Sequence, residues 1–352
     1  MTRWFCNKEY EVRSLTITKA YSGEHMKRSK SLLLLNAFAV ATLIFFQVLP
    51  AAAASEGSFQ RTLTVNGPVH MDLTTGSGNV QVRTGSSNQV QVTGHIRVTE
   101  WFGGNGEDKI KRLEKNPPIQ QSGNDIRIGH IDDPDLRHNI SISYDVIVPA
   151  ATDLRVESGS GNQTVEGIQG PLEVTAGSGA LNISGIGERV HAETGSGDIQ
   201  INQVKGNVHA KTGSGSIEAE EIAGGFDADS GSGHITLHQT APGSVRVDTG
   251  SGGMDLRGVR GSLDAKAGSG TIAAEGSPIG AWNLHTGSGS VELKIPSGAA
   301  FDLAAHTSSG SISVDQPHTV QGSVGRKEIR GKVGGGGVPV DVETGSGDIQ
   351  IQ

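Results

Sequence analysis

The tripeptide Gly-Ser-Gly recurs along this chain at a nearly constant interval, and this repeat constrains the fold more than any other feature. Successive copies lie 18 residues apart, or 19 in two cases, with first glycines at Gly159, Gly177, Gly195, Gly213, Gly231, Gly250, Gly268 and Gly287. Further copies begin at Gly76 and Gly345. A fixed period of this length is typical of solenoids, in which each repeat buries its apolar side only against its neighbours.

Apolar and polar residues alternate on both sides of each tripeptide. Leu172-Glu173-Val174 precedes Gly177, and Leu181-Asn182-Ile183 follows it. Alternation with a period of two indicates half-buried strands. Each repeat is therefore predicted to hold two short strands, joined by the Gly-Ser-Gly corner and closed by a looser second corner. Tight corners often require a positive φ, which glycine adopts without steric cost.

A single coil buries too little apolar surface to offset the entropy lost when it is ordered. The coils must therefore stack and pair in parallel with those above and below. Connections between parallel strands are overwhelmingly right-handed. We expect an all-β fold, a right-handed parallel β-solenoid (β-helix) with about 18 residues per coil.

The N-terminal region has the pattern of an export signal. Met26-Lys27-Arg28-Ser29-Lys30 is basic, Leu32 to Leu49 is apolar, and Ala51 to Ala54 are small. This order is typical of a secretory signal peptide, here residues 26–54, cleaved near Ala54. Residues 1–25 lack that pattern, so we expect translation to begin at Met26. If it stays uncleaved, Leu32 to Leu49 is long enough to anchor the chain in a membrane.

Charge and cysteine content narrow the possible partners. The chain carries 29 Lys+Arg and 37 Asp+Glu, a formal net charge of −8. Binding to phosphate needs clustered basic side chains, so we expect neither nucleic acid nor anionic lipid as a partner. Cys6 is the only cysteine and precedes Met26, so we expect no disulfide in the mature chain.

Two parts of the chain depart from the regular repeat. Residues 55–150 combine alternating segments with a helical pattern over 107–115, and we expect an irregular β section that caps the solenoid. The solenoid repeats are assigned to 151–352. Within them, 315–337 is predicted to leave the rod before 338–351 forms a final coil. Either that excursion or a partner chain must cover the open edge of the last coil.

The repeats resemble the bacterial putative-adhesin family, a domain of unknown function. The similarity lies in Tyr144 to Pro149 followed by Leu154 to Gly161, in the Thr-Gly-Ser-Gly-x-Ile repeats, and in the ending from Gly336 to Ile349. It covers about residues 59–352. The resemblance implies an exported β-helical domain of the cell envelope with a role in adhesion, and it supplies no catalytic or binding residues.

The sequence does not favour either of two more specific functions, calcium binding and carbohydrate cleavage. Gly195-Ser196-Gly197-Asp198 resembles a calcium-binding glycine-rich repeat, but such sites need a carboxylate in every turn. The residue after Gly-Ser-Gly is instead variable: Asn162, Ala180, Asp198, Ser216, His234, Gly253, Thr271 and Ser290. A carbohydrate-active enzyme needs paired carboxylates on one face. The outward column mixes both signs of charge, as a solvated face does: Glu157, Thr175, Glu193, Lys211, Asp229, Asp248, Lys266 and His285.

Histidines and aromatics supply the remaining candidate contacts. His191 and His209 lie 18 residues apart in one column, so we expect them to be stacked neighbours. Two imidazoles can bind a metal ion, but no adjacent cysteine or carboxylate completes a tetrahedral set in the same column, although Asp227 follows on the next coil. Solvated side chains are the simpler interpretation. Trp101 and Phe102 lie in a glycine-rich break, where they either plug the end of the rod or contact a ligand.

We therefore expect a non-enzymatic protein without cofactors, found in the periplasm, on the cell surface or secreted. Its repetitive face would bind an envelope polymer or a protein, as an adhesin or scaffold. One alternative is a periplasmic polysaccharide-binding or polysaccharide-active protein, which carboxylates converging beside Trp101 or Trp282 would favour. The other is a membrane-anchored sensor of envelope stress, which requires an uncleaved Leu32–Leu49 segment.

Overall fold

The computed structural model describes residues 54–352 except 87, 100–104 and 316–317. The signal peptide, the start at Met26 and the Trp101-Phe102 contact all concern residues outside the described ones or at their very edge, and they stay predictions. The described residues belong to one compact unit.

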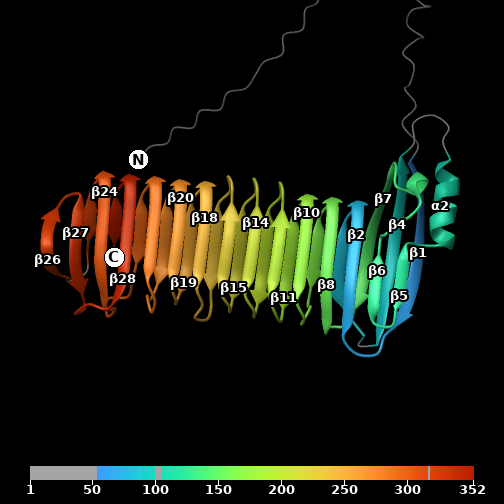
Figure 1. Cartoon of the computed structure of the whole chain (residues 1–352), viewed down its shortest axis with the longest axis horizontal. Helices are drawn as coiled ribbons and strands as arrows, with labels where there is room; N and C mark the ends of the chain where they lie inside the picture. Colours follow the sequence, from blue (N-terminus) through green and yellow to red (C-terminus); the bar gives the residue numbers. More distant parts are fainter. Residues whose placement is uncertain (1–53, 87, 100–104, 316–317) are drawn as a thin grey trace, which may run out of the picture. The chain divides into compact units, whose positions relative to one another are not determined.

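The described residues form two sheets that face one another along a rod (Figure 1). Sheet A, in spatial order, contains β1 (Ala54–Thr64), β4 (Gln89–Thr99), β7 (Ile140–Val148), β3 (Val80–Thr84), β9 (Gln163–Glu166), β11 (Leu181–Ile186), β13 (Ile199–Val204), β15 (Ile217–Ile222), β17 (Ile235–Gln239), β19 (Met254–Val259), β21 (Ile272–Gly276), β23 (Val291–Lys294), β29 (Ile349–Ile351) and β25 (Ile312–Val314).

Sheet B contains, from the opposite end, β26 (His318–Gly325), β27 (Glu328–Val333), β24 (Phe301–Ser309), β28 (Val338–Ser346), β22 (Trp282–Ser288), β20 (Leu263–Ser269), β18 (Val245–Ser251), β16 (Phe226–Ser230), β14 (Val208–Thr212), β12 (Val190–Thr194), β10 (Leu172–Ser178), β8 (Thr152–Ser160), β2 (Val69–Ser77), β6 (Asp125–Ile128) and β5 (Ile119–Ser122).

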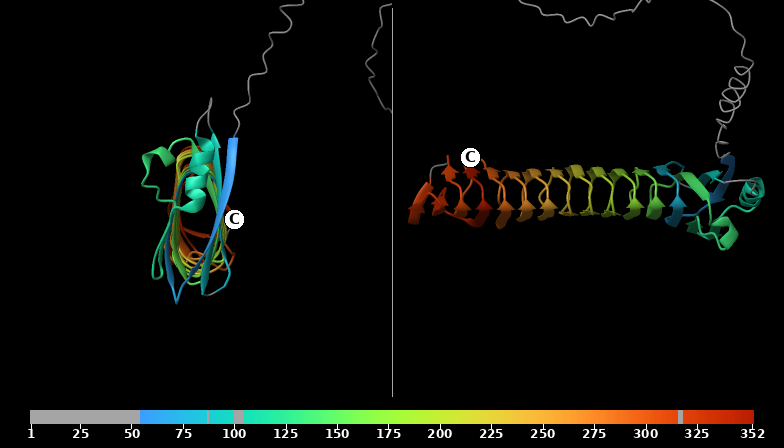
Figure 2. Two further views of the ribbon diagram at one scale, coloured as in Figure 1. Left: turned by 90° about the vertical axis from the view of Figure 1, so that its right-hand side faces the viewer. Right: turned by 90° about the horizontal axis from the view of Figure 1, so that it is seen from above.

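The predicted coil is confirmed. Each repeat contributes one strand to sheet B and, after the Gly-Ser-Gly corner, one strand to sheet A. Equivalent residues pair in parallel, as Leu172 does with Val190 and Leu181 with Ile199. In Figure 1 the strands of the nearer sheet point upward while the chain advances from right to left, which makes the coil right-handed. The end-on view in Figure 2 shows the flattened cross-section that two facing sheets produce.

The core is a continuous column of apolar side chains between the sheets. The burial pattern along β12 and β13 alternates in step with the sequence, so that Val190, Ala192, Ile199 and Ile201 are all at most 2% exposed. The column includes Trp282, which is fully buried and donates its indole N–H to the carbonyl of Gly261 at 3.0 Å. Trp282 is thus a core residue, not a contact on the surface.

The corner glycines are required for two reasons. The second glycine of the tripeptide has the predicted positive φ in several coils, including those of Gly161 and Gly179. Neither Gly195 nor Gly197 has a φ in the left-handed region. A Cβ at Gly195 would instead lie 2.5 Å from the carbonyl oxygen of Gly177, and one at Gly197 would lie 2.0 Å from that of Gly179. The backbones of successive coils approach so closely at the corner that any side chain would collide with the coil beneath.

A row of buried hydroxyl groups fastens each corner to the next. Thr212 Oγ1 donates to the Gly197 carbonyl at 2.9 Å and accepts from the Gly215 N–H at 3.1 Å. The equivalent hydroxyl of each of the following coils donates to the carbonyl of the second glycine of the Gly-Ser-Gly corner beneath: Thr194 to Gly179, Ser230 to Gly215, Thr249 to Gly233, Thr286 to Gly270, Thr344 to Gly289 and Thr307 to Gly347. The threonine that precedes Gly-Ser-Gly therefore bonds one coil to the next.

The coil stack begins earlier than the assigned boundary at residue 151. Strands β2 and β3 already form a coil around Gly76, and β2 pairs in register with β8. Residues 85–151 leave the stack between these two coils. They contain β4 and β7, which extend sheet A: β4 pairs antiparallel with both β1 and β7, and β7 pairs in parallel with β3. The helix α2 (Gly106–Lys115), close to the predicted 107–115, packs on β1. A short 3-10 helix, η1 (Pro134–Leu136), precedes β7.

The last coil of the sequence is predicted to lie at the end of the rod, but the structure places it inside the stack. β28 lies between β22 and β24, and β29 lies between β23 and β25. The C-terminal coil is therefore inserted beneath the coil of 301–314, which precedes it in sequence. The excursion folds into the antiparallel strands β26 and β27, and β27 covers the edge of β24. The covered edge thus belongs to the coil of 301–314, while the last coil lies inside the stack.

The close approach at the corners predicts unequal effects for two equivalent glycines. Gly195→Ala should lower the free energy of unfolding by about 1–3 kcal/mol, because its Cβ meets the Gly177 carbonyl. Gly76 has the same place in the first coil, where no atom lies within 4 Å of a built Cβ, so Gly76→Ala should change stability by less than about 0.5 kcal/mol. Urea unfolding of both variants tests this, and equal losses would contradict it.

Candidate functional site

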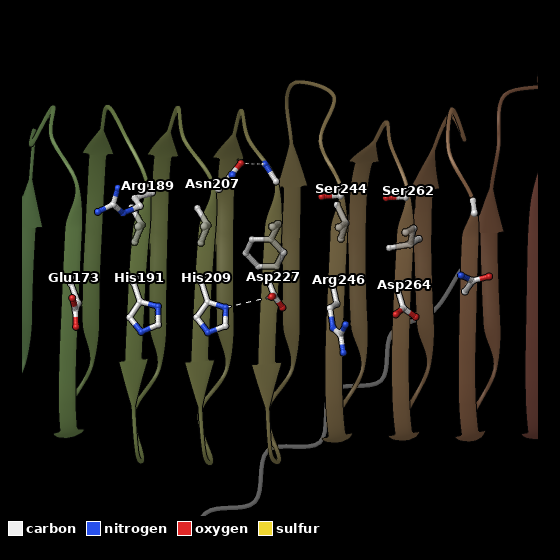
Figure 3. Close-up of a pocket in the computed structure, with 18 residues that line it drawn as sticks. Glu173, Arg189, His191, Asn207, His209, Asp227, Ser244, Arg246, Ser262 and Asp264 are labelled. Carbon is white, nitrogen blue, oxygen red and sulfur yellow. Dashed lines mark hydrogen bonds and ion pairs between the residues drawn. The ribbon is translucent and has the colours of Figure 1, made fainter.

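A long groove runs along the outer surface of sheet B and crosses several coils. It has a volume of about 870 Å³ and opens widely to solvent. Its floor is formed by the second residue of successive strands and the loop residue before each strand (Figure 3). The outward residues of this row, in order, are Glu173, His191, His209, Asp227, Arg246, Asp264 and Asn283.

Strand pairing determines this order. The second residue of each strand is directly opposite its counterpart on the next, and parallel neighbours lie about 4.8 Å apart. Basic or neutral residues separate the acidic ones, since Arg246 lies between Asp227 and Asp264. The groove therefore contains three carboxylates, but they lie on separate strands and do not converge beside Trp282, which is buried.

The predicted stacking of His191 and His209 is found in the structure. The two residues pair across β12 and β14, and their rings lie 4.9 Å apart between centroids with an angle of 5° between planes. Both side chains are 40% exposed. His209 Nδ1 lies 3.5 Å from a carboxylate oxygen of Asp227 on the following coil (Figure 3).

Glu193 was missed as a partner of this pair. It lies two residues after His191 on β12, so both side chains project from the same face of the sheet. Its Oε1 lies 3.3 Å from His191 Nε2. The 18-residue spacing that pairs His191 with His209 does not include Glu193. The alternation along β12 does place Glu193 on the same face as His191.

Aspartate and asparagine side chains directly after Gly-Ser-Gly have a structural role. Asp198 Oδ1 accepts the backbone N–H of Ser216 at 2.8 Å, and Asn162 does the same for Ala180 at 3.1 Å. Asp348 accepts both the N–H and the hydroxyl of Ser311, which holds the pKa of its carboxyl below the usual range. These oxygens are bonded to the corner of the adjacent coil.

A smaller cavity of about 390 Å³ lies near the N-terminal end, beside Tyr144. The Tyr144 hydroxyl is buried without a hydrogen-bond partner among the described residues, and burial raises its pKa. The ring itself packs edge-on against Phe59. The lining of this cavity also includes His130 and Arg137.

No helix among the described residues has both the length and the apolar character needed to cross a membrane.

Several solved structures match this chain at low sequence identity. A putative cell adhesion protein from Clostridium sporogenes is 11% identical, with 84% of this chain and 99% of that chain covered and a TM-score of 0.22. A putative adhesin from Bacteroides fragilis is 13% identical, with 85% and 98% covered and a TM-score of 0.32. A putative lipid binding protein from Parabacteroides distasonis is 11% identical, with 84% and 97% covered and a TM-score of 0.39. Among curated proteins, none matches this chain.

A family model matches far more directly. The Toastrack DUF4097 model aligns twice, with residues 79–239 and with residues 190–352, so that its matches extend over most of the coil stack. Both matches contain complete coils with the Gly-Ser-Gly corner and its preceding threonine. The chain belongs to the Toastrack DUF4097 family.

Proposed function

We propose that this protein is a non-enzymatic binding module, exported to the bacterial cell envelope, which holds an extended polymer or protein in the groove on sheet B. The observation that carries the proposal is the groove itself. It follows the rod axis across several coils and presents polar side chains at the regular spacing of the strands. A ligand with a repeating, extended shape can contact several coils in the same way.

Two further features support binding over catalysis. The groove is open and its charged side chains are partly exposed, whereas catalytic sites generally exclude water around the reacting groups. Its carboxylates are separated by residues of other charge, which does not suit the paired carboxylates of glycoside hydrolysis. Adhesion is also the role implied by the resemblance of the repeats to the putative-adhesin family.

Export rests on the signal-peptide pattern of residues 26–54. We expect the mature protein, recovered from the periplasm or the medium, to begin near residue 55. Mass spectrometry of the intact mature chain measures this directly. A chain that keeps Leu32 to Leu49 and stays in the membrane fraction would contradict export and favour the anchored sensor.

Binding through the groove is tested by comparing two double variants on a glycan array and with envelope extracts. Arg246→Ala/Asp264→Ala removes a neighbouring pair of opposite charges from the groove. Arg257→Ala/Asp255→Ala removes an ion pair of 2.7 Å from the outer face of sheet A. Both double variants leave the net charge unchanged.

The groove variant should lose at least about tenfold in affinity for whatever ligand the wild type captures, because a desolvated charged contact contributes more than 1 kcal/mol. The sheet A variant should bind like the wild type. Equal binding by all three proteins would contradict a ligand site in the groove. Release of shortened glycans during incubation would instead support the polysaccharide-active alternative.

A further inference from the structure

We propose that His191, Glu193 and His209 form a binding site for a divalent transition-metal ion of the Zn²⁺ class. This proposal goes beyond polymer binding and does not depend on it. Its starting point is the stacked pair of imidazoles, which the register of β12 and β14 holds side by side. Because both rings are attached to paired strands, the sheet sets the distance between them, and no loop has to become ordered to bring them together.

The third group comes from the same strand as the first histidine. Glu193 Oε1 lies 3.3 Å from His191 Nε2, and the ligand atoms offered by the three side chains all lie within 4.8 Å of one another. Zinc binds nitrogen and oxygen at about 2.0–2.2 Å, so tetrahedral ligand atoms lie about 3.3 Å apart. One pair already has this separation, and rotation of partly exposed side chains can bring in the third atom.

The ligand set also matches the chemistry of this metal class. Two imidazoles and one carboxylate are ligands found in catalytic zinc centres, where a water molecule takes the fourth position. Imidazole favours Zn²⁺ and its neighbours in the transition series, whereas Ca²⁺ and Mg²⁺ prefer sites made of oxygen alone. Within the part of the chain that the structure describes, this is the one such cluster of three residues.

Asp227 gives the site a feature that an accidental pair of histidines would lack. Its carboxylate lies 3.5 Å from His209 Nδ1, on the side facing the next coil. An N–H donated from Nδ1 to a carboxylate leaves Nε2 as the metal ligand and fixes the orientation of the ring. Carboxylates positioned in this way commonly accompany metal-binding histidines.

Lys211 places a positive charge next to the proposed metal site. It is the register partner of Glu193 across β12 and β14, so both side chains project from the same face of the sheet and the positive charge of Lys211 disfavours a cation nearby. Removing that charge while keeping a polar side chain should therefore strengthen metal binding. If Zn²⁺ bound the surface nonspecifically, the loss of this one lysine would not strengthen binding.

The test is a calorimetric titration of Zn²⁺ into the metal-free full chain, produced without a polyhistidine tag. We expect one ion per chain. His191→Ala and His209→Ala should each weaken binding by more than tenfold, and Asp227→Ala by about tenfold. Lys211→Gln should bind more tightly than the wild type. All four residues project from the surface, so circular dichroism should show an unchanged fold.

His238→Ala is the matched control. His238 pairs with Glu220 at 3.3 Å on sheet A, but its register neighbour on the next strand is Arg257 rather than a second histidine. This variant should bind Zn²⁺ like the wild type, and Co²⁺ in place of Zn²⁺ should give the intense visible absorption of a tetrahedral centre. Absence of binding by the wild type, retention of binding by the His191→Ala/His209→Ala double variant, or an equal loss in His238→Ala would each overturn the proposal.

Discussion

The hydrogen bond from a buried hydroxyl to the glycine carbonyl of the coil beneath is the interaction on which the rod depends. It joins adjacent coils at the one place where their backbones come closest, and it satisfies polar groups that the apolar core cannot. Glycine makes the approach possible and threonine or serine makes it favourable. A threonine or serine followed by Gly-Ser-Gly thus forms the contact between coils in most repeats.

This contact follows position in the stack, not order in the chain. Thr344 bonds to Gly289, and Thr307 bonds to Gly347, so the inserted C-terminal coil uses the same hydrogen bonds as coils that follow one another directly. Two coils lack the hydroxyl and have Ala176 and Ala267 at its position, both of them buried. The stack therefore tolerates isolated gaps in the row of hydroxyl groups, as expected when each coil is also held by ladder hydrogen bonds and apolar packing on both sides.

The regular part of the fold could be predicted from the sequence because every coil repeats the same order of apolar, polar and glycine residues. The strands, their parallel register, the corner and the stacking of His191 on His209 all follow from the period and the alternation. The position of the last coil could not be predicted in this way. Val340 suits the core beside Trp282 as well as it suits the core beside Leu303, so periodicity alone gives no order to equivalent coils.

The candidate sites, like the fold, could be predicted from the sequence only in part. The histidine pair follows from one column of the repeat, but the nearby Glu193 lies in the next column, and the groove arises from loops whose shape the pattern does not specify. The positive φ of several corner glycines is a local property and could be predicted, whereas the close approach of Gly195 to Gly177 involves the neighbouring coil and could not.

The most direct test of the account is the stability of Thr212→Val, in which the side chain keeps its shape but loses both hydrogen bonds at the corner. The account predicts a loss of about 1–3 kcal/mol in the free energy of unfolding, measured by urea denaturation. Thr175→Val, which replaces an outward hydroxyl on β10, should change stability by less than about 0.5 kcal/mol. If Thr212→Val is as stable as the wild type, the hydroxyl row does not hold the coils together.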